Sequence, residues 1–188
     1  MKLKLLLLFF IPCLSSQLNT NTPEFFFTAS GMIAFTSDAP LEIIKASSNK
    51  LRGLINVEDK SFSFRVAYRS FEGFNSGLQR EHFNDKYMES EKYHEAIFNG
   101  EITDKIDFSK DGTYEINVTG KLNIHGIVKE RIINSILIIG NGSIHIESKF
   151  NVLLDDHNIR IPKVVTQKIA TEIFVEVKAD LKKRELSN

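Results

Sequence analysis

The fold is decided by the stretch TYEINVTGKLNI, which runs from Thr113 to Ile124. Almost every second residue in it is apolar: Tyr114, Ile116, Val118, Leu122 and Ile124. The residues between them are mostly polar: Thr113, Glu115, Asn117, Lys121 and Asn123. This period of two is typical of a β-strand with one buried face and one solvated face.

Three further stretches, residues 61–69, 144–152 and 172–181, alternate in the same way. Their apolar positions are Phe62, Phe64, Val66, Tyr68, Ile144, Ile146, Phe150, Val152, Ile173, Val175, Val177 and Leu181. Because a register slip of one residue turns a whole face outward, strand parity requires that these faces share one interior. We therefore expect a single core that holds Phe62, Phe64, Tyr114, Ile116, Ile144, Phe150, Ile173 and Val175.

Turn-forming residues separate these strands. Lys110-Asp111-Gly112 and Gly140-Asn141-Gly142 both favour hairpin turns. No alternation of strands with helices occurs, so the sheet is expected to be antiparallel. About eight strands would fit either a closed barrel or a sandwich, and closure would remove exposed strand edges.

One stretch departs from the strand pattern. Ser76-Gly77-Leu78-Gln79 has the form of a capping box and predicts a short helix from about Gly77 to Asn84. Large apolar side chains follow before the next strand: Tyr87, Met88 and Tyr93. Loops of this length between strands often carry function. We expect this excursion to lie over one end of the sheet structure, because such side chains need cover.

The excursion and a second motif carry a family resemblance. The first motif comprises Leu78-Gln79-Arg80-Glu81-His82-Phe83, Lys86-Tyr87-Met88 and Lys92-Tyr93-His94-Glu95-Ala96-Ile97-Phe98. The second is Gly120-Lys121-Leu122-Asn123-Ile124-His125-Gly126-Ile127-Val128-Lys129. In this order they resemble the YceI-like family, whose patterns are roughly R-D-x-H-L, K-F/Y-P-x-A-x-F and G-x-L-x-x-H-G-V-T-K.

The resemblance implies an all-β fold, an antiparallel eight-stranded lipocalin-like barrel with a short helical excursion. It also implies a binding protein, not an enzyme, that holds a polyisoprenoid or another long-chain amphiphile in an elongated cavity. Three departures concern polar contacts: the family's Arg-Asp pair falls on Gln79 and Arg80, its proline on His94 and its threonine on Val128. The chain is also shorter before Phe62 than usual members, so the cavity mouth is expected to differ.

The interior is where a ligand is expected. The chain holds 15 Phe and 4 Tyr, and a barrel of this size can be filled by side chains or hold one slender ligand. With the resemblance in favour of a ligand, the expected contact residues are Phe62, Phe64, Val66, Phe83, Tyr87, Met88, Tyr93, Phe98, Tyr114 and Ile116. The head-group candidates are Arg80, His82 and His125. For His125 the alternative is that it only fixes the end of its strand.

The N-terminal residues 1–16 are typical of a secretory signal peptide. Lys2 and Lys4 precede an apolar run from Leu5 to Leu14, and Ser15-Ser16 follows. The run is too short to span a bilayer, which needs about 20 apolar residues. We expect a periplasmic or secreted protein with a flexible lead-in at 17–24, the barrel domain at 25–184 and a tail at 185–188. Lipidation of Cys13 is the alternative, although Pro12 stands where bacterial lipoproteins carry a small residue.

Charge and motifs argue against several function classes. The chain has 24 basic and 24 acidic residues, and no basic run indicates a nucleic-acid partner. His82, His94, His125, His145 and His157 lack the spacing of a metal site, no cofactor is expected and no catalytic motif occurs. Asp155-Asp156 is expected to form a turn.

Several alternatives stay open. They are an envelope stress-related barrel with no stable ligand, an outer-membrane barrel, and an enzyme that uses the cavity. The sequence does not decide between a monomer and a homodimer.

Overall fold

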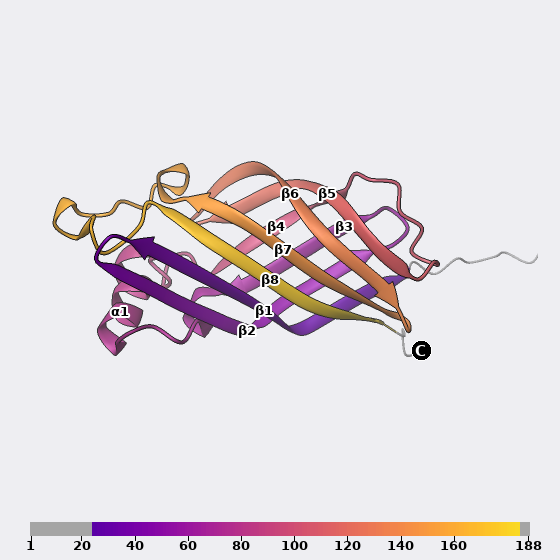
Figure 1. Ribbon diagram of the computed structural model, residues 1–188, viewed down its shortest axis with the longest axis horizontal. Coiled ribbons are helices and arrows are strands. Elements are labelled where there is room, and N and C mark those ends of the chain that lie inside the picture. The colour runs from indigo at the N-terminus through magenta and orange to yellow at the C-terminus, as the bar shows by residue number, and fades with distance from the viewer. Residues whose placement is uncertain (1–23, 185–188) are drawn as a thin grey trace, which may run out of the picture.

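Eight strands close into one antiparallel barrel in the computed structural model, which describes residues 24–184 (Figure 1). In chain order they are β1 (Phe25–Ala39), β2 (Glu42–Asn56), β3 (Ser61–Ala67), β4 (Glu95–Ile102), β5 (Gly112–Ile124), β6 (Ile127–Gly140), β7 (Ser143–Leu153) and β8 (Glu172–Lys183). Each strand pairs with the next, and β8 pairs back onto β1. The barrel is therefore confirmed. The expected signal peptide, nearly all of the lead-in and the tail lie outside the described residues.

The strand faces predicted to be dry share one interior. Phe62, Ile116, Ile144 and Val175 are buried, and the other predicted residues pack beside them partly buried: Phe64, Tyr114, Phe150 and Ile173. Full burial of a large apolar side chain contributes about 1.5–3 kcal/mol. The outer faces of the same strands carry exposed residues such as Arg65, Glu115 and Lys149.

One of the two predicted hairpin turns is confirmed and the other is wrong. Asn141 and Gly142 join β6 to β7 at φ 52° and 69°, a left-handed backbone that these residue types adopt readily. Lys110 and Asp111 instead end a longer loop between β4 and β5. The turn comes earlier in that loop, because the Asp107 carboxylate accepts hydrogen bonds from the Ser109 amide at 3.1 Å and hydroxyl at 2.6 Å.

All helical segments lie at one end of the barrel, which we call the α1 end (left in Figure 1). Between β3 and β4 lie η1 (Tyr68–Ser70), α1 (Gly77–His82) and η2 (Phe83–Tyr87), and between β7 and β8 lie η3 (Leu154–His157) and η4 (Lys163–Val165). The β1–β2 and β5–β6 turns share this end, because connections after odd-numbered strands do so in such a barrel. The opposite end we call the far end. No described helix is both long and apolar enough to cross a bilayer.

Helix α1 begins where the sequence predicts. The Ser76 hydroxyl caps it by accepting a hydrogen bond from the Gln79 amide at 3.2 Å. The Gln79 side chain accepts from the Asn75 amide at 3.1 Å rather than from Ser76. The α-helix ends at His82, earlier than predicted, because the backbone continues as the π-helical segment η2.

On the outer face of the barrel, His145 of β7 lies between two carboxylates. Its Nδ1 is 2.7 Å from Asp180 Oδ1 and its Nε2 is 3.3 Å from Glu147 Oε1. The hydrogen bond to Asp180 raises the pKa of His145 above its ordinary value of 6.5, although partial burial opposes the shift. The folded state therefore favours the charged ring.

We expect His145→Gln to lower the free energy of unfolding at about pH 5.5 and to leave it unchanged at about pH 9. The stabilisation is fully present below the unfolded-state pKa, and it is lost as the pH rises through the raised folded-state pKa. Urea unfolding at both pH values measures the difference. The control is His94→Gln, since His94 Nδ1 lies 3.0 Å from the Ser90 carbonyl rather than a carboxylate. An equal loss at both pH values would contradict the charge argument.

Candidate ligand cavity

Two neighbouring cavities occupy the barrel interior. The larger, about 310 Å³, lies at the α1 end, and the smaller, about 90 Å³, lies deeper between the strands. Both are lined by Ile33, Val66, Ala96, Leu122 and Phe150, so they follow one another along the barrel. Ligand pockets in proteins begin at about 300 Å³, a size that the larger cavity alone reaches.

The larger cavity lies between the barrel and two covering segments. Residues 68–94, the β3–β4 segment, contribute Tyr68, Phe71, Phe74, Gln79, His82, Phe83, Tyr87 and Met88. Residues 154–171, the β7–β8 loop, contribute Leu154, Ile159, Ile161, Val165, Lys168 and Ile169. The strand walls include Phe35, Ile44, Val152 and Val175. The lining is therefore almost wholly apolar.

Phe83 holds the β3–β4 segment on the barrel. Its ring stacks on Phe35 of β1, with 5.4 Å between centroids and 19° between planes. Phe71, Phe74 and Tyr68 surround it at 5.8, 5.2 and 6.3 Å. Such aromatic pairs contribute about 0.5–1.5 kcal/mol each beyond their buried area. The Phe83 side chain thus both lines the larger cavity and holds the β3–β4 segment against the barrel.

Phenylalanine rings narrow the barrel at the smaller cavity. Phe62 lies 5.0 Å from Phe98 and 6.0 Å from Phe64, and all three line this cavity. Glycines on neighbouring strands make room for the rings. A Cβ on Gly120 would come within 2.8 Å of the Phe98 ring, and a Cβ on Gly53 would overlap the ring of Phe64.

Hydrogen bonds around His125 tie three segments together at the α1 end. His125 lies in the β5–β6 turn at φ 52°. Its Nε2 is 2.6 Å from Glu89 Oε2, and its Nδ1 donates to the His157 carbonyl at 3.1 Å. Its amide donates to the Tyr68 hydroxyl at 3.1 Å. The turn, the β3–β4 segment and the β7–β8 loop are therefore joined at one residue.

Burial shifts three pKa values at this end. It raises the pKa of the Tyr68 hydroxyl to about 12 and also raises the pKa of Tyr87. It lowers the pKa of His157, whose Nδ1 donates to the Ile127 carbonyl at 3.1 Å. All three groups are therefore neutral near pH 7, which suits an apolar site.

Polar groups gather where the larger cavity reaches the surface, and we call them the rim. The rim comprises Glu42 from β2, Gln79 and His82 from α1, and the exposed Lys168 from the β7–β8 loop. Gln79 Nε2 donates to Glu42 Oε1 at 2.6 Å. His82 Nε2 accepts from Lys86 Nζ at 3.0 Å, because a lysine ammonium can only donate. The rim can therefore both donate to and accept from a small polar head group.

The structure brings most of the predicted contact residues to the two cavities. Phe62, Phe64, Phe98 and Ile116 line the smaller one, Phe83, Tyr87 and Met88 line the larger one, and Val66 lines both. Of the head-group candidates, His82 lines the larger cavity.

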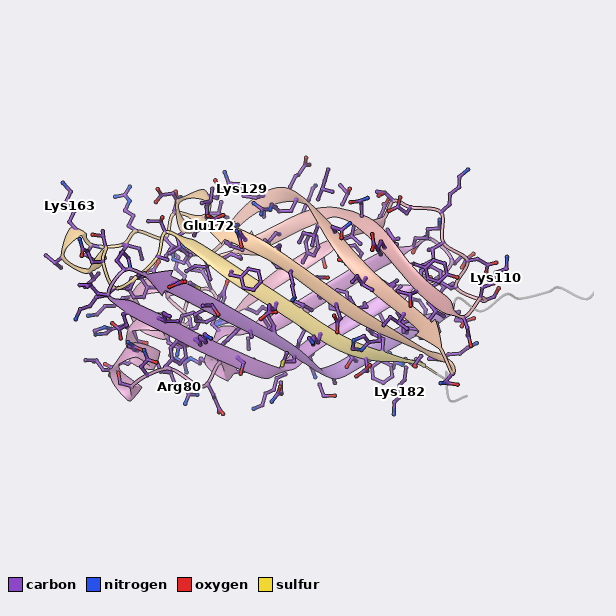
Figure 2. The ribbon with its side chains drawn as sticks, viewed as in Figure 1. Arg80, Lys110, Lys129, Lys163, Glu172 and Lys182 are labelled. Atoms are coloured by element: carbon purple, nitrogen blue, oxygen red, sulfur yellow. The ribbon has the colours of Figure 1, made fainter. Side chains whose placement is uncertain are left out.

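Four predicted site residues lie outside the lining of both cavities, because each finds a partner in the scaffold. The Tyr114 hydroxyl donates to the Lys110 carbonyl at 3.0 Å near the far end. Tyr93 packs against the His125 ring, with 4.6 Å between centroids. Arg80 donates to the Arg69 carbonyl at 3.2 Å and projects outward from α1 (Figure 2). His125 is held in its turn, which agrees with the interpretation that it fixes the strand end.

Sequence reasoning missed the β7–β8 loop as a cavity wall. Its apolar residues, Ile159, Ile161, Val165 and Ile169, follow neither a strand nor a helix period. Apolar residues in a segment between strands would have been the signal that the loop covers something. Phe35, Phe71 and Phe74 were also missed as lining residues, because the sequence around them does not alternate regularly between apolar and polar residues.

Within residues 24–184, no three His, Cys, Asp or Glu side chains gather closely enough to hold a metal ion. Asp155 and Asp156 lie in η3, and Asn158, the residue that follows η3, has φ 55°. The expected turn is therefore present there.

A comparison with protein families decides the classification. Residues 21–181 match a family model described as the YceI-like domain. The chain belongs to the YceI-like family. The resemblance that the motifs indicated is thus confirmed. A search of curated proteins finds no significant match.

Solved structures share the YceI-like fold at low sequence identity. A polyisoprenoid-binding domain from Saccharophagus degradans, implicated in plant cell wall breakdown, has a TM-score of 0.72 and 11% identity over 87% of this chain and 100% of its own. BcnA from Burkholderia cenocepacia has a TM-score of 0.67 and 14% identity over 81% and 96%. A YceI protein from Campylobacter jejuni has a TM-score of 0.53 and 13% identity over 98% and 91%. These likenesses show the fold.

We expect Phe83→Ala to lower the free energy of unfolding by about 3 kcal/mol, in the lower part of the range for this change because the ring is only partly buried. Urea unfolding measures the loss. Leu78→Ala is the control in the same segment, since Leu78 is 59% exposed, and it should cost less than about 0.5 kcal/mol. Similar losses for the two variants would show that the Phe83 ring does not hold the segment.

Proposed function

We propose that this protein binds one amphiphile with an isoprenoid or other long hydrocarbon tail, and that the tail lies inside the barrel. The observation that carries the proposal is the larger cavity, about 310 Å³ with almost wholly apolar walls. Empty apolar space destabilises a fold, because protein interiors otherwise pack closely. A polyisoprenoid-binding domain of the same fold supports an isoprenoid-like tail.

Transfer of the tail from water supplies enough affinity. Each buried methylene contributes about 0.8 kcal/mol, so about ten carbons contribute about 8 kcal/mol. Before the costs of association, that corresponds to a Kd of about 1 µM. No specific head-group contact is required, which is consistent with the loss of the family's Arg-Asp pair at Gln79 and Arg80.

We place the polar head at the rim and the tail toward the smaller cavity. Lys168, Gln79 and the Nδ1–H of His82 supply donors there, and the Glu42 carboxylate supplies the acceptor. The tail would first fill the larger cavity and then meet the rings of Phe62, Phe64 and Phe98. These rings would limit the length of tail that the barrel accepts.

The alternatives are less well supported. A membrane-embedded barrel needs apolar side chains outward and polar ones inward, whereas the apolar faces of these strands turn inward. An enzyme would need reactive groups gathered at the cavity, whereas at the rim Glu42 and Gln79 are hydrogen-bonded to each other and His82 is hydrogen-bonded to Lys86. The N-terminal sequence pattern supports a place in the periplasm or outside the cell.

Native mass spectrometry tests the proposal directly. The protein would be purified without detergent from its own cell envelope, and its lipids would be extracted and identified. We expect one hydrocarbon-tailed amphiphile per chain. Protein that never carries a lipid, in the envelope or after incubation with isoprenoid alcohols, would contradict the proposal and favour a stress-related barrel without a stable ligand.

We expect Val152→Phe to reduce lipid loading with less than about 1 kcal/mol of lost stability, because the larger ring fills cavity space. Val152 is 5% exposed and lines the larger cavity, whereas its neighbour Leu153 is 46% exposed on the outer face. Leu153→Phe is therefore the matched control and should load normally. If the interior were already filled, Val152→Phe would overpack it and cost about 1–3 kcal/mol.

Phe98→Ala should shift the preference toward longer tails, because it enlarges the smaller cavity, which the Phe98 ring lines. We expect the ratio of affinities for a long and a short isoprenoid alcohol to rise by about tenfold, as a few additional buried methylenes would produce. Competition binding measured by mass spectrometry gives the ratio. Phe174→Ala, at a side chain 39% exposed, should leave the ratio unchanged. An unchanged ratio in Phe98→Ala would contradict the proposal that these rings limit the length of the bound tail.

A further inference from the structure

Exposed apolar side chains concentrate at the α1 end of the barrel. The large apolar side chains that are more than half exposed are Leu41, Ile43, Leu78, Val128, Ile132 and Val164. All except Ile132 belong to the turns, loops and strand ends of the α1 end, whereas Ile132 lies mid-strand in β6 opposite Thr119. Val164, at 91%, is the most exposed of them.

Leu41 and Val164 belong to one surface region, the tip, which we define as Leu41 together with residues 162–168. Leu41 lies in the β1–β2 turn and is 68% exposed. Its amide donates to the Gln167 carbonyl at 2.8 Å, which ties the turn to the β7–β8 loop. Two apolar side chains are thus held out to solvent on connected segments, where no described residue covers them.

The part of the β7–β8 loop that carries the tip is positively charged, since Asp155 and Asp156 of this loop lie before it, in η3. Residues 157–171 contain Arg160, Lys163 and Lys168 and no Asp or Glu. All three basic residues are exposed. Lys163 projects from the extreme α1 end of the molecule, at the opposite end from Lys182 (Figure 2). Basic side chains around exposed apolar ones are typical of surfaces that meet anionic lipid head groups.

The same loop covers the larger cavity from its inner side. Ile161, Val165, Lys168 and Ile169 line the cavity, whereas Lys163 and Val164 do not. Within a few residues, the loop therefore presents some side chains to the cavity and others to the outer surface. A hydrocarbon tail passing between these faces and a bilayer would avoid a crossing through bulk water.

We propose that the tip docks on an anionic phospholipid bilayer, so that the rim of the larger cavity opens toward the membrane surface. Val164 and Leu41 insert among the head groups, and Arg160, Lys163 and Lys168 contact lipid phosphates. This inference rests on the proposed binding of an amphiphile, because it supplies the route by which the ligand enters.

Vesicle co-sedimentation of the full chain tests the docking. We expect binding to vesicles of phosphatidylglycerol with phosphatidylcholine, and weak binding to phosphatidylcholine alone. Lys163→Glu should weaken binding by about tenfold or more, because reversal changes two charges at the surface. Lys182→Glu, the same change at the far end, should have no effect. Val164→Ser should weaken binding, and Ile132→Ser, at 71% exposure, should not.

A second measurement separates docking from ligand binding. Lys163→Glu and Val164→Ser should bind a short-chain amphiphile in solution with unchanged affinity, but should take up a lipid from vesicles more slowly. Val152→Phe should dock normally and load poorly. If the chain docks but no variant ever binds an amphiphile, the proposed function fails and the docking stands.

Other outcomes would overturn the docking proposal. One is equal vesicle binding by Lys163→Glu and the parent chain. Another is a shift from dimer to monomer in Val164→Ser by mass photometry with no change in vesicle binding, which would assign the tip to contact between copies of this chain. Binding to a carrier protein but not to vesicles would likewise overturn it.

Discussion

The hydrogen bonds between β1 and β8 close the sheet on itself, and the rest of the structure depends on that closure. The pairing sets Phe35 opposite Val175 and Ile33 opposite Val177, so the first and last strands contribute neighbouring side chains to one interior wall. Without it, the apolar faces would meet water along an open edge, and neither cavity would have a complete wall.

The cover of the larger cavity is fastened unevenly. On one side, His125 joins the β5–β6 turn to both covering segments, and Phe83 packs into a cluster of aromatic rings. On the other side, a backbone hydrogen bond from Leu41 to Gln167 and the contact between Gln79 and Glu42 hold the rim. The rim is held by hydrogen bonds, including those of the Asn75 side chain with Glu42 and Ile43, and not by packed aromatic rings, so we expect ligand exchange to occur there.

Sequence patterns predicted the fold where alternation was clean, as in β5, β7 and β8. They did not single out β6, because outward positions such as Ile132 and Ile138 are apolar too and hide its period of two. The strand residues that line the cavities could be predicted, because alternate residues of each strand face the interior. The roles of Arg80 and Tyr93 could not, because each depends on a tertiary partner: the Arg69 carbonyl and the His125 ring.

The packing of Phe64 against Gly53 has a consequence for divergence within the family. A methyl group at Gly53 would collide with the Phe64 ring and with no other group so closely, so the two positions cannot change independently. Relatives that acquire a wider or differently shaped bore should exchange both members together, a smaller side chain for the ring and a larger one for the glycine. The width of the barrel interior would then change through paired substitutions on adjacent strands.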